Sequence, residues 1–215
     1  MNKLKIDFVS DISCPWCIIG LRGLEEALER SRDVIEADIS FQPFELNPDM
    51  PAGGQNLVDI MIKKFGSTVE KSAEARDMIK ARAASVGFTM AMNDESRVYN
   101  SFDAHRLLHW AGLRGRQHAL KQQLFRAYFT DGLDISNHAT LGEISGKAGL
   151  DSVEAGEVLA SGRYADEVRA AEQLWQSRGI SSVPAIVVND RYLISGGQPP
   201  EAFEQALRKI AAEEG

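Results

Sequence analysis

The sequence predicts an α/β fold that is interrupted by a large helical insertion. Three observations support this prediction: the chain opens with a strand–helix–strand pattern, its middle shows helix signals and almost no strand signal, and its last part returns to mixed helices and strands. We therefore expect one α/β domain made of residues 1–44 and 163–215, and a helical insertion domain over residues 45–162.

The opening unit follows from its hydrophobic pattern. Residues Lys3–Val9 alternate between apolar and polar side chains, which predicts a strand. Apolar residues then recur at helical spacing after Pro15, a residue that suits the first turn of a helix because its missing N–H has no partner there. Residues Val34–Phe44 are rich in Ile and Phe and predict a second strand. These elements form a β-α-β unit.

The middle of the chain reads as a series of helices. Three segments have the sequence of a helix start, namely Ser67–Glu70, Thr140–Glu143 and Asp151–Glu154. The predicted helices cover residues 56–65, 68–86, 99–112, 116–130, 140–148 and 152–160.

The last part of the chain predicts a helix, a hairpin and a terminal helix. Residues Tyr164–Arg178 are helical in pattern, and Ser182–Val188 leads into a strand. Asn189-Asp190 is a two-residue hairpin signal, and Arg191–Ser195 is the returning strand. The terminal helix starts after Pro199 and reaches about residue 212.

Composition excludes several classes of protein. The 215 residues carry a net charge of −7, which repels phosphate backbones and argues against a nucleic-acid partner. The two cysteines cannot form a disulfide framework. The chain shows neither the apolar run of a signal peptide nor a stretch of ~20 apolar residues that would span a membrane. We therefore expect a cytoplasmic protein.

Both cysteines lie in the segment Cys14-Pro15-Trp16-Cys17, at the predicted strand-to-helix corner. A Cys-x-x-Cys motif beside a β-α-β pattern is typical of thioredoxin-like redox proteins. The N-terminus of a helix presents unpaired N–H groups and the positive end of the helix dipole, which favour the reactive thiolate of Cys14. We expect Cys14 to attack a substrate disulfide and Cys17 to resolve the mixed disulfide, while Trp16 offers a flat apolar contact to the substrate.

The cysteine pair could instead form half of a zinc site, because structural zinc takes four ligands from cysteine and histidine. The nearest histidine, His105, lies 88 positions beyond Cys17, and it shares an i, i+4 spacing with His109. The proline and the strand-to-helix context favour redox chemistry, so we predict no metal site.

A second signal lies at Val183-Pro184, just before a predicted strand. In a thioredoxin-like fold this turn faces the cysteine motif, and the backbone of Val183 can pair with an extended substrate or with glutathione as an added strand. Together with the cysteine motif, this position predicts a cis bond before Pro184, although only about 5% of X–Pro bonds are cis. The alternative is a trans proline at the start of a strand.

Five segments carry a resemblance to a known family: Asp11–Cys17 with Gly20, Pro43–Pro48, Asn100–Leu107, Gly179–Pro184 and Ser195–Gln198. In these segments the chain resembles the DsbA family of thioredoxin-fold oxidoreductases, and most closely its cytosolic FrnE-like branch. The resemblance covers nearly the whole chain. It implies a thioredoxin-like fold with a large all-helical insertion, thiol–disulfide exchange through Cys14 and Cys17, and a cis bond before Pro184.

The chain also resembles two glutathione-dependent groups, the 2-hydroxychromene-2-carboxylate isomerases and the kappa-class glutathione transferases. Those proteins carry a serine at the position of Cys14 and lack the second cysteine. They also have a Ser-Asp pair where this chain has Gly197-Gln198-Pro199. Both departures argue against a dedicated glutathione enzyme, while glutathione remains a candidate thiol co-substrate.

In these relatives the helix that matches residues 100–111 covers the active site, so the resemblance makes Asn100 and His105 candidates for substrate contact. The same helix carries a stripe of apolar residues that predicts core packing. A buried structural role for His105 is therefore an equal alternative.

The sequence thus predicts a protein disulfide oxidoreductase of the reductase or isomerase type, without a tightly bound cofactor. Its partner would be a disulfide-containing protein or a small-molecule thiol substrate. The first alternative is a glutathione-dependent isomerase or transferase that acts on small aromatic or polyketide-like substrates, and the second is a chaperone or binding module. Monomer and homodimer both stay open.

Overall fold

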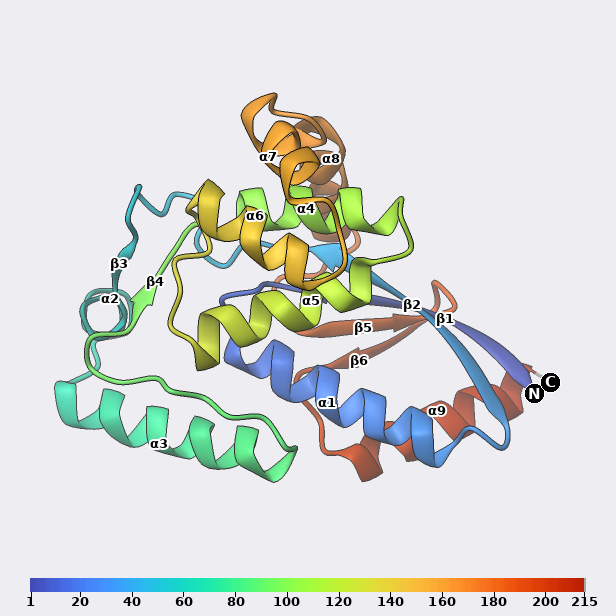
Figure 1. Ribbon diagram of the computed structural model, residues 1–215. Helices are drawn as coiled ribbons and strands as arrows, with labels where there is room; N and C mark the ends of the chain where they lie inside the picture. The colour runs from blue at the N-terminus through green and yellow to red at the C-terminus, as the bar shows by residue number, and fades with distance from the viewer. Residues whose placement is uncertain (215) are drawn as a thin grey trace.

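The computed structural model of the protein describes residues 1–214, and their helices and strands follow the predicted order (Figure 1). The α/β part is made of β1 (Asn2–Ser10), α1 (Pro15–Arg30), β2 (Ile35–Pro43), α8 (Ala165–Ser177), β5 (Ala185–Val188), β6 (Tyr192–Ser195) and α9 (Pro200–Glu214). The prediction of an α/β fold with a helical insertion is therefore confirmed.

The inserted segment is mostly helical, as predicted. It contains α2 (Leu57–Phe65), α3 (Val69–Ser85), α4 (Phe102–Gly112), α5 (Gln117–Phe125), the π-helix η1 (Arg126–Thr130), α6 (His138–Lys147) and α7 (Ser152–Ala160). One feature was not predicted: β3 (Gln55–Asn56) and β4 (Arg97–Val98) form an antiparallel ladder. A ladder of this length leaves no alternation in the sequence, so only tertiary contact reveals it.

The helix starts agree with the sequence signals only in part. The Asp151 side chain accepts hydrogen bonds from the backbone N–H groups of Val153 and Glu154, as a predicted N-cap should. The other two caps are displaced. Thr68 caps α3 in place of Ser67, and Asn137 caps α6, which therefore begins before Thr140. Asn is a stronger cap than Thr, which explains the earlier start of α6.

Within residues 1–214 the main sheet has four strands in the order β2-β1-β5-β6. β1 pairs with β2 in parallel and with β5 in an antiparallel register that sets Val9 opposite Ala185. β5 and β6 form the predicted hairpin. Asn189 and Asp190 adopt φ values of 51° and 55°, the left-handed conformation that a tight two-residue turn requires.

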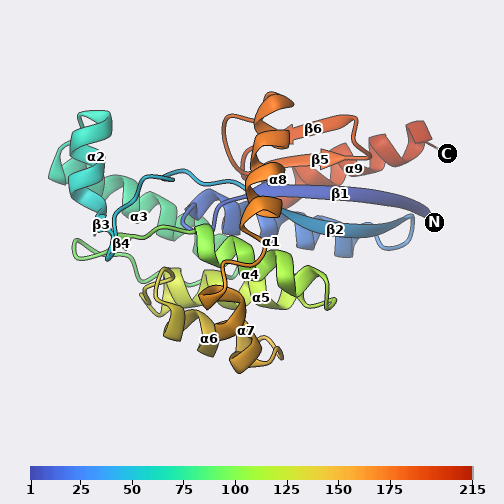
Figure 2. The ribbon, with the colours of Figure 1, turned by 90° about the horizontal axis from the view of Figure 1, so that it is seen from above.

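Helices cover both faces of this sheet. Helices α1 and α9 lie together on one face, α8 crosses the opposite face, and α4 to α7 gather beyond the β2 edge (Figure 2). Ile6 and Phe8 of β1 join a buried cluster with Leu24 of α1, whereas Val9 joins a second cluster with Trp175 of α8. The two faces of β1 thus pack against different helices, α1 on one side and α8 on the other. No helix among the described residues combines the length and the apolar character that crossing a bilayer demands.

Two glycines allow α1 to approach the loop that follows β6. A Cβ on Gly197 would lie 2.9 Å from the Trp16 carbonyl oxygen, and a Cβ on Gly20 would lie 3.1 Å from the Pro184 side chain. Both distances are below ordinary van der Waals contact. Glycine at these positions therefore lets the N-terminal turn of α1 lie directly against the loops at 184 and 197.

We predict that Gly197→Ala lowers the free energy of unfolding by about 1–3 kcal/mol, because the new methyl group must push a backbone oxygen aside. Chemical denaturation measures the change. Gly156→Ala is the matched control: a Cβ there meets nothing within 4 Å, so this change in α7 should raise stability by about 0.5–1 kcal/mol. Equal effects of the two substitutions would contradict the prediction.

Candidate active site

The cysteine motif forms the first turn of α1. Cys14 is the N-cap residue, with extended backbone angles, and Pro15 opens the helix. The Cys14 N–H donates to the Asp11 carbonyl (3.3 Å), and the Cys17 N–H donates to the Cys14 carbonyl (3.1 Å). This turn places Cys14 at the positive end of the α1 dipole, and no side chain caps this helix end in the described structure.

The loop before β5 meets this turn. The Cys14 thiol lies 3.7 Å from the carbonyl oxygen of Val183, a residue 169 positions away in the chain. The peptide bond between Val183 and Pro184 is cis. The structure therefore brings together three of the sequence-predicted site residues, and the partly exposed Trp16 lies beside them in the same turn.

The two thiols, both free, have different environments. Cys17 is fully buried, whereas 4% of Cys14 is exposed. Burial raises the pKa of the Cys17 thiol well above its usual range, and a hydrogen bond with the Cys14 sulfur raises this pKa further. Cys14 is therefore the less enclosed of the two thiols, and burial favours the protonated form of Cys17.

A buried carboxylate shapes the turn before Cys14. One oxygen of Asp11 accepts the Ser13 N–H (3.1 Å), and the other accepts the Leu46 N–H (2.7 Å). Asp11 is completely buried. It therefore ties the cysteine turn to the segment that follows β2.

His105 of α4 also contacts the segment that follows β2. Its Nε2 donates to the Phe44 carbonyl (3.1 Å) and lies 3.9 Å from a carboxylate oxygen of Asp11. Only 3% of the surface of His105 is exposed. Burial lowers the pKa of His105 well below its usual value, and the positive charge of Lys121 lowers the pKa further. His105 is therefore a neutral donor inside the protein.

Asn100 lies just before α4 and also contacts this segment. Its amide nitrogen donates to the Pro48 carbonyl (3.1 Å), and its amide oxygen accepts the Phe102 N–H (2.9 Å). The structure thus places His105 in α4 and Asn100 just before that helix, and it engages both in internal hydrogen bonds. Their role as substrate contacts stays a prediction.

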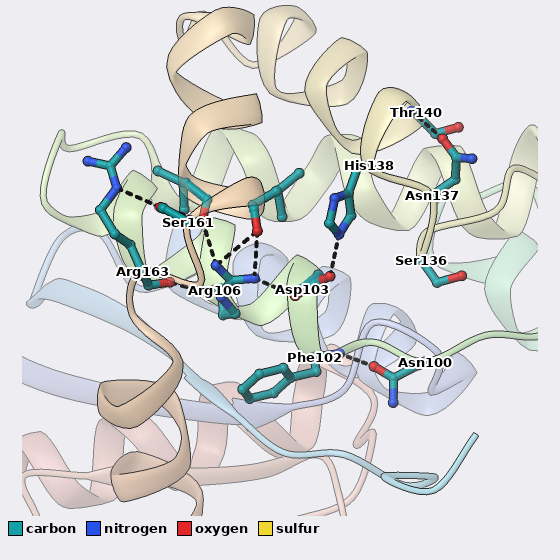
Figure 3. A network of polar contacts seen from close by, with 12 residues as sticks. Asn100, Phe102, Asp103, Arg106, Ser136, Asn137, His138, Thr140, Ser161 and Arg163 are labelled. Atoms are coloured by element: carbon teal, nitrogen blue, oxygen red, sulfur yellow. Dashed lines mark hydrogen bonds and ion pairs between the residues drawn. The ribbon is translucent and has the colours of Figure 1, made fainter. Parts of the chain in front are cut away.

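Two other polar residues of α4, Asp103 and Arg106, join helices to one another (Figure 3). The Arg106 guanidinium donates to the carbonyls of Val158 (2.5 Å) and Arg163 (2.8 Å) and to the Asp103 carboxylate (2.6 Å). His138 of α6 lies 2.7 Å from the second oxygen of Asp103. These bonds join α4 to α6 and to the end of α7, so Asp103 and Arg106 have a structural role.

Among the buried charged residues that the sequence reasoning missed is Lys121 of α5, which is 0% exposed. Its position carried a signal: Lys121, Leu124, Phe125 and Tyr128 recur at helical spacing along one stripe. A lysine on such a stripe faces the core. The residue was overlooked because lysine is rarely buried.

The described residues contain no cluster of three or more His, Cys, Asp or Glu side chains arranged to hold a metal ion. A cavity of about 590 Å³ lies between β2 and helices α4, α5 and α8, and neither cysteine lines it. The Cys14 thiol therefore lies outside this cavity.

We predict a pH effect on stability that depends on His105. Because the folded pKa lies below the unfolded value of about 6.5, the unfolded state binds more protons between these two values, and stability is lost as the pH falls through this window. Lowering the pH from about 7.5 to about 5.5 should therefore cost wild type about 1.4 kcal/mol more than His105→Gln.

Urea denaturation at both pH values measures this difference. Burial also raises the pKa of Glu45, to about 7, but Glu45 is present in both proteins, so its contribution cancels in the comparison. His109→Gln on the same helix is the control and should follow wild type. Parallel pH curves for wild type and His105→Gln would show that His105 is not held neutral by burial.

The comparisons with known proteins agree with this geometry. Residues 5–208 match the DSBA-like thioredoxin domain. The chain is similar to the probable DsbA oxidoreductase SCO1869 from Streptomyces coelicolor, with 36% sequence identity, a TM-score of 0.91, and coverage of 99% of this chain and 91% of that chain.

Two further solved structures share the fold at 15% identity. One is a 2-hydroxychromene-2-carboxylate isomerase, with a TM-score of 0.71 and coverage of 98% of this chain and 97% of that chain. The other is the cytosolic disulfide reductase DsbM from Pseudomonas aeruginosa with glutathione. It has a TM-score of 0.63, and the match covers 96% of this chain and 98% of that chain. Because the domain match spans nearly the whole chain and the fold agrees with it, the protein belongs to the DSBA-like thioredoxin domain family.

Proposed function

We propose that the protein is a thiol–disulfide oxidoreductase that reduces or isomerises disulfides through Cys14 and Cys17. The observation that carries this proposal is the position of the Cys14 thiol, at the N-terminus of α1 and 3.7 Å from the Val183 carbonyl. A nucleophilic sulfur and a backbone edge that can align an extended substrate meet at this point.

In the first step the Cys14 thiolate attacks one sulfur of a substrate disulfide. A bond forms between this sulfur and Cys14, and the other substrate sulfur leaves as a thiolate. The difference in burial supports this role for Cys14, because Cys17 is fully enclosed and Cys14 is 4% exposed. We propose Trp16, Val183 and the cis Pro184 as the surface that the substrate contacts.

In the second step Cys17 attacks the Cys14 sulfur, which forms the Cys14–Cys17 disulfide and releases the second substrate thiolate. The substrate gains two electrons and the cysteine pair loses them. Since burial raises the pKa of Cys17, this thiol becomes a nucleophile only when its proton can leave.

The direction of the reaction and the reductant are part of the proposal. DsbM, which shares this fold, is described as a cytosolic disulfide reductase and was solved with glutathione. We propose that this protein is likewise cytoplasmic and that glutathione restores its dithiol form as a thiol co-substrate. No tightly bound cofactor is required, because the two cysteines carry the electrons themselves.

We predict that Cys17→Ser lowers the turnover of a disulfide substrate at least about a hundredfold, because the mixed disulfide on Cys14 is no longer resolved. Mass spectrometry should show a stable adduct on Cys14. Cys17→Ala is the control for the buried hydroxyl of serine and should trap the same adduct. Failure of the wild-type pair to form an intramolecular disulfide in glutathione buffers would refute the proposed function.

A second candidate is a glutathione-dependent isomerase or transferase, which the fold shared with 2-hydroxychromene-2-carboxylate isomerase favours. Such an enzyme needs only one activating residue at position 14. If this function holds, Cys17→Ser should keep full activity in glutathione conjugation or isomerisation of small aromatic substrates. Loss of both activities in this variant would exclude the second candidate and leave disulfide exchange.

A further inference from the structure

The strand β2 forms one edge of the main sheet. Within residues 1–214 the strand order is β2-β1-β5-β6, so β2 has β1 on one side and no strand on the other (Figure 2). The cavity of about 590 Å³ between β2, α4, α5 and α8 follows this edge, and residues 38–43 line it. An edge strand presents unpaired N–H and C=O groups to its surroundings. The backbone of β2 is therefore accessible to a ligand from this cavity.

The side chain of Gln117 occupies one position along this edge as a neighbouring strand would. The Phe41 N–H donates to the Gln117 Oε1 (2.9 Å), and the Gln117 Nε2 donates to the Phe41 carbonyl (3.0 Å). In an antiparallel ladder, two residues that lie opposite each other exchange the same pair of bonds. The backbone of Phe41 therefore points away from β1 and binds an amide group in the manner of a paired strand.

The outward direction recurs at every second residue of a strand. Ile39 and Ala37 therefore also turn their N–H and C=O groups away from β1. Ile35 agrees with this pattern, because its N–H donates to the Ser31 carbonyl outside the sheet (2.9 Å). Ile39 and Ala37 have no such partner among residues 1–214, so two consecutive ladder positions are open.

The charges beside these open positions are negative. Asp38 lies between Ala37 and Ile39, and Glu167 of α8 lines the same cavity. Both carboxylates are exposed, and neither forms an ion pair with another residue of the described chain. The residues that line the cavity, all of them within the described part, include no lysine or arginine. A segment that pairs with this edge therefore gains from a positive side chain opposite Asp38.

The lysine next to Asp38 is already engaged elsewhere. Lys5 of β1 is in register with Asp38, but its ammonium lies 2.8 Å from Asp190 and 3.1 Å from Asp7. The charge of this lysine is thus shared by two other carboxylates. Asp38 is left available to a cation from outside the chain.

Asp38 and Glu167 lie on the same face of the sheet. Val9 of β1 packs in one cluster with Trp175 of α8, and Lys5 lies four residues earlier in the same strand and on the same face. Because Asp38 is in register with Lys5, its side chain points to the face that α8 covers. A positive side chain placed opposite Asp38 therefore also extends towards Glu167.

A second copy of this chain does not suit the edge. If two β2 strands paired through Ala37 and Ile39 of each copy, the antiparallel ladder would set the two Asp38 side chains directly opposite each other. Pairing of Ala37 with its own copy would instead set Glu36 opposite Asp38. Like charges in opposite positions destabilise a ladder, so a basic partner strand is favoured over a second copy.

We propose that the outer edge of β2 is a docking site for an extended, basic peptide segment of a partner protein. The segment pairs antiparallel with Ala37 and Ile39 through backbone hydrogen bonds, and it places a lysine or arginine opposite Asp38 and towards Glu167. The amide of Gln117 ends the ladder on one side. This site goes beyond the proposed function, because neither cysteine lines the cavity and no step of disulfide exchange uses it.

The first experiment locates the site by NMR of the full-length, nitrogen-15-labelled protein. The probe is the blocked peptide acetyl-Thr-Val-Lys-Val-Thr-amide, whose lysine faces Asp38 between two pairing valines. We expect the amide signals of Ala37 and Ile39 to move most during the titration, and their amide hydrogens to exchange more slowly in the complex. The Phe41 amide hydrogen, already bonded to Gln117, should exchange slowly with and without the peptide. Unmoved Ala37 and Ile39 signals at millimolar peptide would overturn the proposal.

Methylation of single peptide nitrogens tests the backbone ladder. In the antiparallel pairing both valine N–H groups donate to β2, whereas the lysine N–H points away from it. N-methylation of either valine should therefore weaken binding about tenfold, while N-methylation of the lysine nitrogen should leave the affinity within about twofold. Equal losses at all three positions would contradict a paired strand.

Charge variants test the chemistry of the partner. Asp38→Lys should weaken binding of the lysine peptide about fivefold, because an attractive cross-strand pair becomes a repulsive one, and it should strengthen binding of the same peptide with glutamate in place of lysine. Glu143→Lys makes the same change in net charge on the exposed side of α6 and is the matched control. It should keep the wild-type affinities. An unchanged preference for the lysine peptide in Asp38→Lys would reject the role of Asp38.

One further outcome would assign the edge to a different occupant. If the Ala37 and Ile39 signals shift with protein concentration in the absence of peptide, the edge pairs with a second copy of this chain and the proposal is wrong. None of these measurements depends on the cysteine pair. Failure of this inference and failure of the proposed function are therefore distinguishable.

Discussion

The pairing of β1 with β5 is the constraint on which the rest of the site depends. It joins residues 6–9 to residues 185–188, and it does so across the whole helical insertion. Because Val9 lies opposite Ala185, the turn that follows β1 and the loop that precedes β5 emerge at the same end of the sheet. The Cys14 thiol therefore meets the Val183 carbonyl at 3.7 Å. Closing so long a loop is entropically unfavourable, and the buried strands β1 and β5 supply the contacts that offset this cost.

The helical insertion completes the site from the protein interior. Its helix α4 provides His105, which hydrogen-bonds to the Phe44 carbonyl, and its helix α5 provides Lys121. The Asp11 carboxylate receives the Leu46 N–H in the same region. These polar groups are buried and, apart from Lys121, each has a hydrogen-bond partner, as buried polar groups require. Among the described residues of this region, the Lys121 Nζ is therefore the exception.

Local sequence signals predicted the elements well where they act within a few residues. The alternation of residues 3–9, the Pro15 helix start and the Asn189-Asp190 turn all correspond to structure. The caps of α3 and α6 moved because several Ser, Thr and Asn residues compete near each helix start. The β3–β4 ladder was not predicted, because two-residue strands, here at positions 55–56 and 97–98, are too short to show an alternation of apolar and polar residues. Such features arise from contacts between distant segments.

The sequence by itself determined the fold class, the two cysteines of the redox motif and the place of that motif at a strand-to-helix corner, because these follow from local periodicity and spacing. Only the tertiary structure decided which groups surround the thiols. The burial that separates Cys14 from Cys17, the internal hydrogen bonds of Asn100 and His105, and the unpartnered Lys121 depend on how sheet, α1 and insertion pack together. Desolvation and charge act through space, so the pKa of Cys17 depends on its burial and also on Lys121, a residue more than a hundred positions away in the chain.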